Sequence, residues 1–186
     1  KNFYHKPQIS LRHSWQINKK SFLSNVAYLS IGNGGGTRDD GPTDFVRDST
    51  GQIDFGKSAE NNLPSFFNPD GLANTFISAS INNHFWYGLL STYRYEMNAN
   101  WVLSGGIDIR SYQGDHWREV HDLIGATGYT TDNLQVGDKF DFDYSSFVNW
   151  AGVFGLAEYS IGKINSFMNV SYANTSYNAE NFFSGQ

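Results

Sequence analysis

The stretch that decides the fold runs from Phe85 to Arg110 and reads FWYGLLSTYRYEMNANWVLSGGIDIR. Apolar and polar residues alternate along both halves, and Asn98-Ala99-Asn100 separates the halves. Successive side chains of a strand point to opposite faces, so alternation is typical of a strand whose two faces meet different surroundings. Asn favours turns because its side chain hydrogen-bonds the local backbone. The stretch therefore predicts a hairpin of two amphipathic antiparallel strands.

Two further hairpins are predicted by the same pattern. One runs from about residue 7 to residue 31, with a short polar break at Asn18-Lys19-Lys20. The other runs from about residue 147 to residue 172, with a tight turn at 160–163. The strand at 21–31 is sorted less cleanly into an apolar and a polar face, so its outward face stays unassigned. The alternation thus predicts six strands in three hairpins.

Two long loops, at about 33–82 and 113–146, connect these hairpins. Both are rich in turn-forming residues, and connections of about 4 to 6 residues are the norm. Every short turn thereby falls at one end of the strands and every long loop at the other, which is typical of outer-membrane barrels. We predict an all-β fold, an antiparallel up-and-down transmembrane β-barrel, with the two long loops extracellular.

Six strands are too few for a closed barrel. Unpaired backbone groups are too costly in lipid, so a membrane-spanning sheet must close on itself, and the smallest such barrels have about 8 strands. We therefore expect residues 1–186 to form a partial barrel domain, with the remaining strands in sequence beyond both ends.

Composition excludes several other classes of protein. Aromatic residues make up 17% of the chain, which argues against disorder, and no apolar run reaches the roughly 20 residues of a membrane-spanning helix. The net charge is −5 without a basic patch, so nucleic acid is not an expected partner. The absence of Cys removes disulfides and thiol catalysis. No catalytic set of side chains is placed by spacing, so we predict no enzyme, no cofactor and no resident metal.

Aromatic side chains stand near both ends of the predicted strands. Amphipathic rings settle at the two membrane interfaces of a barrel, although aromatic residues are also common in strands generally. The interface aromatics that we predict are Trp15, Trp101 and Tyr159 beside the short turns, and Phe85, Trp86 and Tyr112 at the loop ends.

Several segments resemble the barrel of a TonB-dependent outer-membrane receptor of the Bacteroidetes type. The resemblance covers nearly the whole chain and is weakest at 38–80 and 126–146. The matching segments are INNHFWYGLLSTY at 81–93, WVLSGGIDIRSY at 101–112 with GDH at 114–116 and EVHDLIG at 119–125, YHKPQISL at 4–11, AYLSIG at 27–32 and GGGT at 34–37.

The resemblance implies a transporter that imports a nutrient across the bacterial outer membrane. Members of that family form barrels of about 22 strands around a plug. The implied partners are the TonB–ExbB–ExbD energy-coupling complex acting through the plug, a surface lipoprotein lid and outer-membrane lipid. The plug and the TonB box have no counterpart in these residues, and the substrate is not implied.

Charged residues of the central hairpin are the candidate functional residues. Arg94, Glu96, Asp108 and Arg110 alternate with apolar residues and should point into the lumen, where they line a substrate path, contact the plug or pair with one another. The apolar residues should look outward and be exposed. The outward set is Leu89, Tyr93, Leu103, Ile107, Ile109, Phe154 and Met168.

Two loop motifs invite a metal-site interpretation. His116 and His121 flank Glu119 without the spacing of a zinc protease motif, and a short exposed helical turn at 117–124 explains them more simply. An acidic cluster at 138–143 has the chemistry to hold Ca²⁺, but a solvated extension of the strand that follows accounts for it as well. We predict a metal at neither place.

Two alternative functions remain open on the sequence. A soluble or surface-attached β-sandwich could bind carbohydrate through exposed aromatic residues, and a passive porin would share the barrel. A sandwich would pack the apolar residues against a second sheet, whereas a barrel turns them towards lipid.

Overall fold

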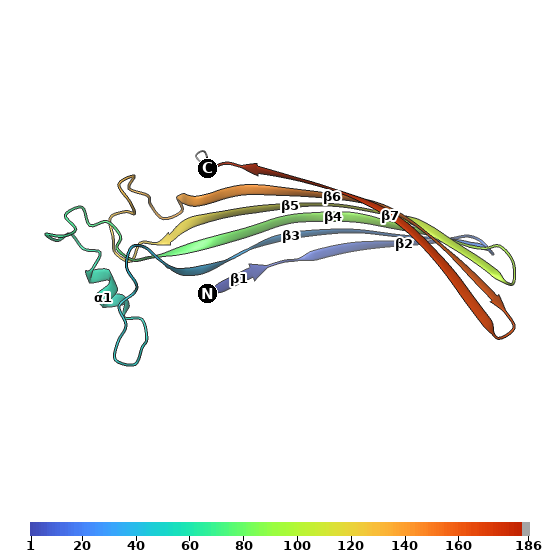
Figure 1. Ribbon diagram of the computed structural model, residues 1–186, viewed down its shortest axis with the longest axis horizontal. Coiled ribbons are helices and arrows are strands. Elements are labelled where there is room, and N and C mark those ends of the chain that lie inside the picture. The colour runs from blue at the N-terminus through green and yellow to red at the C-terminus, as the bar shows by residue number, and fades with distance from the viewer. Residues whose placement is uncertain (184–186) are drawn as a thin grey trace.

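A single antiparallel sheet makes up most of the chain in the computed structural model, which describes residues 1–183 (Figure 1). A short helix and two loops gather at one end of the sheet. The elements are β1 (Asn2–His5), β2 (Gln8–Asn18), β3 (Ser21–Asp40), α1 (Phe55–Glu60), β4 (Phe76–Glu96), β5 (Trp101–Asp122), β6 (Lys139–Ile161) and β7 (Ile164–Asn181).

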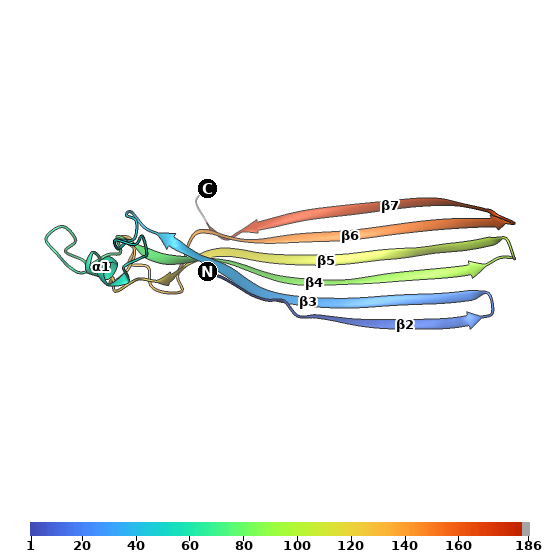
Figure 2. The same cartoon turned by 90° about the horizontal axis from the view of Figure 1, so that it is seen from below.

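The strands follow one another across the sheet in chain order, each antiparallel to the next (Figure 2). Both β1 and β2 pair with β3, and they lie end to end along it, interrupted at Lys6-Pro7. The seven strands therefore occupy six positions across the sheet. This confirms the predicted meander of three hairpins.

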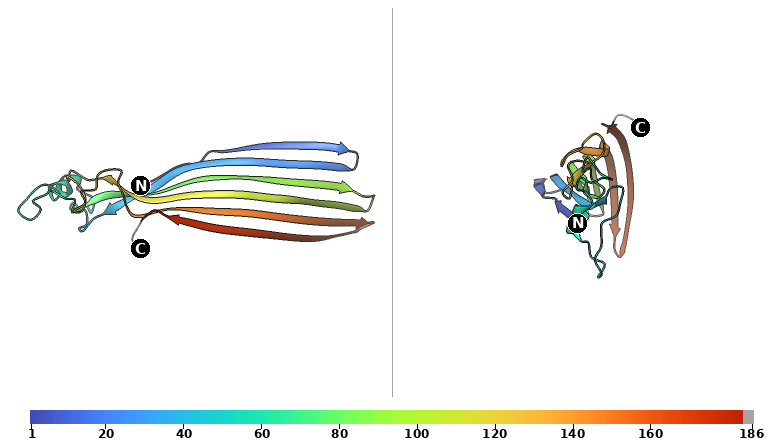
Figure 3. Two further views of the ribbon diagram at one scale, coloured as in Figure 1. Left: turned by 90° about the horizontal axis from the view of Figure 1, so that it is seen from above. Right: turned by 90° about the vertical axis from the view of Figure 1, so that its left-hand side faces the viewer.

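The short turns share one end of the sheet and the long loops share the other, as predicted (Figure 3). Neighbouring turns are hydrogen-bonded to one another. The amide of Glu96 donates to the carbonyl of Lys20 at 2.8 Å, and the amide of Ser160 donates to the carbonyl of Asn100 at 2.8 Å. The three turns thus form a continuous rim.

The strands are longer and the loops shorter than the sequence predicted. β3 to β6 have 20 to 23 residues each, and the loops shrink to 41–75 and 123–138. The helical turn predicted at 117–124 is wrong, because β5 continues in ladder pairing as far as Asp122. A bulge between Ile77 and Ser78 and another beside Trp117 shift the register, which hides the alternation there.

The register sorts the side chains onto two faces, because directly paired residues point to the same side. We call one the apolar face; Leu11, Ala27, Leu89, Ile109 and Ala151 form one row across it. We call the other the polar face; Arg12, Val26, Leu90, Asp108 and Gly152 form the neighbouring row.

Ladder pairing assigns the face that the sequence left open in β3. Leu23, Ala27, Leu29 and Ile31 lie on the apolar face through their partners in β4. From the short turns up to the row of Phe85, no Asp, Glu, Lys or Arg occupies the apolar face. The apolar face is therefore uncharged across all six strand positions over that length.

Most of the predicted outward set is confirmed as exposed. Ile107 and Ile109 are 39% and 48% exposed and Met168 is 66% exposed, and Leu89 and Tyr93 are exposed too. Leu103 is half-buried on the same face.

Phe154 does not belong to the outward set. It pairs with Gly106 and therefore lies on the polar face, beside Asp108. The prediction failed because alternation within β6 sorts its residues into two sets without saying which set faces which way. Only the register with β5 decides that.

Gly106 leaves room for the Phe154 ring. A Cβ at Gly106 would collide with the carbonyl oxygen of Ser91 and stand 2.7 Å from Cζ of Phe154, whereas one at Gly155 would meet nothing within 4 Å. We expect Gly106→Ala to destabilise the sheet by about 1 to 3 kcal/mol and Gly155→Ala to have little effect. Thermal unfolding of the intact protein, followed by heat-modifiable gel mobility, measures both. Equal melting temperatures for the two variants would contradict the packing.

A cluster of buried apolar residues lies at the end of the sheet where the two long loops are. Phe76 and Val120 are fully buried there with Ala73 and Leu123, and the Phe76 ring packs 4.2 Å from that of Tyr129. Both long loops contribute to this cluster. The loops are therefore packed against each other and against the ends of β4 and β5.

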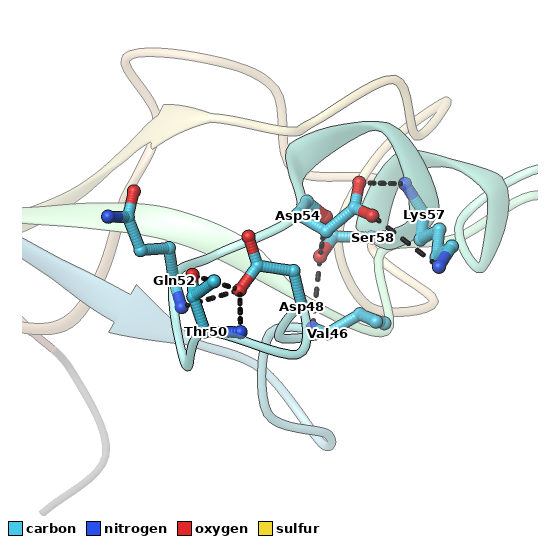
Figure 4. Close-up of polar contacts among 7 residues, drawn as sticks. All are labelled: Val46, Asp48, Thr50, Gln52, Asp54, Lys57 and Ser58. Atoms are coloured by element: carbon cyan, nitrogen blue, oxygen red, sulfur yellow. Dashed lines mark hydrogen bonds and ion pairs between the residues drawn. The ribbon is translucent and has the colours of Figure 1, made fainter.

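Hydrogen bonds within the first loop fix the course of the chain around α1 (Figure 4). The carboxylate of Asp48 accepts bonds from the hydroxyl and amide of Thr50 and from the amide of Gln52, and the bonds from Thr50 hold the pKa of Asp48 below its ordinary value. Asp54 caps α1, and Ser58 donates to the Asp54 carbonyl at 2.8 Å. The carboxylates of Asp48 and Asp54 thus accept hydrogen bonds that stabilise the loop and the start of α1.

Candidate ligand site on the polar face

The four charged residues predicted to be functional share the polar face, where they form two separate ion-paired groups. Nearer the short turns, Arg94 lies 3.7 Å from Glu96 and 3.7 Å from Glu158 of β6. Further along β5, the guanidinium of Arg110 donates two hydrogen bonds to the carboxylate of Asp108. The structure thus supports mutual pairing of these charges and divides them between two places.

Arg110 lines a cavity of about 350 Å³, together with Trp86, Tyr112, Val148 and Trp150. The register explains why these side chains converge. Trp86, Tyr112 and Val148 form one row across three strands, and Arg110 and Trp150 belong to the next row. Three consecutive strands, β4, β5 and β6, therefore build one hollow.

Aromatic rings line the cavity that Arg110 borders. Cζ of Arg110 lies 5.8 Å from the ring centre of Trp150, close enough for a cation–π interaction. Tyr28 of β3 meets Trp86 edge-on at 5.5 Å. The cavity combines flat apolar walls with a single, internally neutralised polar edge.

Further rings continue along the polar face towards the loop end. His84 and Tyr112 lie 6.0 Å apart, and His116 stacks on Tyr144 at 5.0 Å. Nδ1 of His116 also forms a 2.7 Å hydrogen bond with Oδ1 of Asn82. A row of ring-bearing side chains thus leads from the cavity to the loops.

The predicted interface aromatics do not all lie on one face. Trp15, Phe85, Trp101 and Tyr159 lie on the apolar face, where the Trp101 and Tyr159 rings are 4.7 Å apart. Trp86 and Tyr112 lie on the polar face and line the cavity. These two residues therefore do not share a face with the other four, because adjacent residues of a strand such as Phe85 and Trp86 point to opposite sides.

The acidic cluster at 138–143 is divided among separate partners. Asp141 is ion-paired with Arg118, Asp143 lies 2.9 Å from the ammonium of Lys139, and Asp138 accepts a bond from a loop amide. Asp141 and Asp143 belong to β6, as the strand-extension interpretation predicted. Within residues 1–183, no group of three or more His, Cys, Asp or Glu side chains is arranged to hold a metal ion.

Sequence reasoning missed Trp150 and Val148 as functional candidates. Their alternation with small residues marks one face of β6 but does not align that face with Arg110. The two Trp residues and Arg110 come together only through the register of β4, β5 and β6.

No protein-family model matches this sequence, and none of the curated proteins is similar to it. Among residues 1–183, no helix has the length and hydropathy needed to cross a membrane.

Proposed function

We propose that this chain forms part of the wall of a bacterial outer-membrane β-barrel, and that the barrel is a TonB-dependent nutrient transporter. The main observation in favour of a barrel is that the two faces of the sheet differ in polarity. From the short turns to the row of Phe85 the apolar face is uncharged and many of its large side chains are exposed, while Arg94, Glu96, Asp108 and Arg110 lie in two ion-paired groups on the opposite face.

The exposed apolar face argues against a sandwich. A sandwich buries the apolar side of one sheet against a second sheet about 10 Å away. The described residues form one sheet, and Ile9 and Leu11 on its apolar face are each 71% exposed. Exposing such residues to water costs free energy, and contact with lipid removes that cost without a second sheet.

Open edges support a larger barrel. Every residue of β7 and of β2 is exposed, and each of these strands is paired on one side alone. Unpaired strand edges invite aggregation, and a closed barrel removes them. Further strands on both sides would complete the wall.

The choice of a transporter over a passive porin rests on the sequence resemblance to TonB-dependent receptors. Under this proposal a plug fills the lumen against the polar face, and the TonB–ExbB–ExbD complex moves the plug. A surface lipoprotein lid would meet the loop end.

Epitope tags in intact bacteria test the membrane topology. A tag inserted after Asp132, in the second loop, should be accessible to antibody on whole cells. A tag inserted after Gly162, in a short turn, should become accessible only after the outer membrane is opened. Accessibility of both tags, or of neither, would contradict the proposed orientation. Uptake that survives loss of the proton-motive force would favour the passive porin.

A further inference from the structure

We infer that the apolar face binds one phospholipid near the β6–β7 turn, with an acyl chain in a hollow over β5, β6 and β7 and the phosphate at Lys163. The inference rests on the proposed function, because it takes the apolar face to be the lipid-facing side. It adds a defined lipid site to that side of the wall.

The hollow lies on the apolar face close to the short turns and has a volume of about 300 Å³. It extends over two rows of three neighbouring strands. The lining residues on this face are Leu103, Gly155, Ala157, Met168 and Val170.

The hollow forms because small residues occupy the middle strand of both rows. Ala157 stands between Leu103 and Met168 in one row. In the next row Gly155 pairs with a second glycine, Gly105. A Cβ at Gly155 would meet nothing within 4 Å, so the space above β6 is open.

A flexible acyl chain suits this hollow better than a protein partner. Open space beside an apolar wall forfeits dispersion contacts unless other atoms fill it. Met168 and Val170 are 66% and 64% exposed, so their side chains are available to contact such a chain. A stable protein interface needs about 800 Å² from each partner, far more than two rows of three strands offer.

Lys163 gives the end of the hollow nearest the short turns a positive charge. It lies exposed in the turn between β6 and β7, and within residues 1–183 it forms no ion pair. The other charged residue between 155 and 172 is Glu158, which lies on the polar face and is paired with Arg94. The charge at this turn is therefore complementary to a lipid phosphate.

The distance between the charge and the hollow matches a phospholipid. Met168 follows Lys163 by five residues, about 15 to 17 Å at the usual rise of a strand. One leaflet of the hydrocarbon core is about 15 Å thick. A single lipid can therefore contact Lys163 with its phosphate and Met168 with its acyl chain.

Two aromatic rings mark the depth of the head group. Trp101 and Tyr159 form the next row towards the turns, and their rings lie 4.7 Å apart. Trp and Tyr rings settle at the level of the lipid head groups. Because the short turns of outer-membrane barrels face the periplasm, the bound lipid belongs to the periplasmic leaflet.

Native mass spectrometry of the detergent-purified intact protein tests the inference. The probes are phosphatidylglycerol, whose head group is anionic, zwitterionic phosphatidylcholine with the same acyl chains, and inorganic phosphate. We expect one phosphatidylglycerol to bind more tightly than phosphatidylcholine, and inorganic phosphate not to displace it.

Two variants probe the two parts of the site. Gly155→Leu should weaken phosphatidylglycerol binding about tenfold, because the leucine occupies the space of the acyl chain. Lys163→Ala should weaken it about fivefold, the usual contribution of one basic residue near an anionic head group.

Ala151→Leu and Lys19→Ala are the matched controls. Ala151 is an exposed small residue of β6 on the same face, two rows beyond Gly155. Lys19 is an exposed lysine in the turn between β2 and β3, outside the hollow. Both controls should leave affinity unchanged.

Three results would overturn the inference: no single phosphatidylglycerol is retained, phosphatidylcholine or free phosphate competes equally well, or either site variant weakens binding no more than its control. The epitope tags report separately on the barrel. Loss of lipid binding together with the expected tag accessibility would therefore overturn the lipid site and leave the membrane topology standing.

Discussion

In the proposed outer-membrane barrel, Ile107→Arg should strongly reduce assembly of the intact protein, whereas Asp108→Arg should leave assembly intact. The two residues are neighbours in β5 on opposite faces, and Ile107 lies about midway between the short turns and the level of Phe85. An arginine on the lipid side near the bilayer midplane costs about 2 to 4 kcal/mol, while one on the lumen side meets water or protein.

Heat-modifiable gel mobility and surface abundance of each variant measure the effect. Asp108→Arg removes the ion pair with Arg110, which is a local loss on the polar face. Ile107→Leu provides a size-matched control that keeps the apolar surface. Equal loss for both arginine variants, or loss for Asp108→Arg alone, would mean that the assignment of the two faces is reversed.

Replacing Asn62 with Leu should open the packed loops at the other end of the sheet. Asn62 is fully buried, and its amide nitrogen donates to the carbonyls of Thr75, Leu123 and Ile124. Its amide oxygen accepts bonds from the main-chain amides of Asn74 and Thr75. One side chain thus ties the first loop to the second.

Leucine is close to asparagine in size but makes none of these bonds. Each buried backbone group left without a partner costs about 1 to 3 kcal/mol, so we expect the loops to lose about 3 kcal/mol or more of local stability. Hydrogen exchange and limited proteolysis of 41–75 and 123–138 in the intact protein would show it. Asn61→Leu is the control, because Asn61 is the next residue in the chain but its side chain is exposed. Similar protease sensitivity of the two variants would disprove the role assigned to Asn62.

The sequence was sufficient to predict the six strands of the three hairpins and their order, but not β1 or the full length of β3 to β6. Alternation around Asn98-Ala99-Asn100 is a local property, and a tight turn between two alternating segments leaves an antiparallel hairpin as the simple solution. The rim of short turns follows directly, because the three turns separate consecutive strands of a meander. The position of Arg94 and Asp108 on one face was predictable for the same reason.

Side-chain convergence across strands required the structure. Alternation in β6 could not say that Phe154 covers Gly106 or that Trp150 stands beside Arg110, since a shift of one residue in register exchanges the faces. The place of Trp86 beside Tyr112 in the cavity likewise follows only from the pairing of β4 with β5.

At the end of the sheet that carries the long loops, too, the sequence predicted some features and tertiary packing decided others. The residues at that end are rich in turn formers, and that composition correctly predicted two excursions from the strands. Where the strands stop was decided by bulges and by long-range contacts, so β5 continues to Asp122 where a loop was predicted. The burial of Asn62 depends on backbone groups up to 62 residues away in the chain. Local sequence patterns determined which segments are strands, and tertiary packing decided which side chains meet, because hydrogen bonds and contacts between distant segments leave no periodic trace in the sequence.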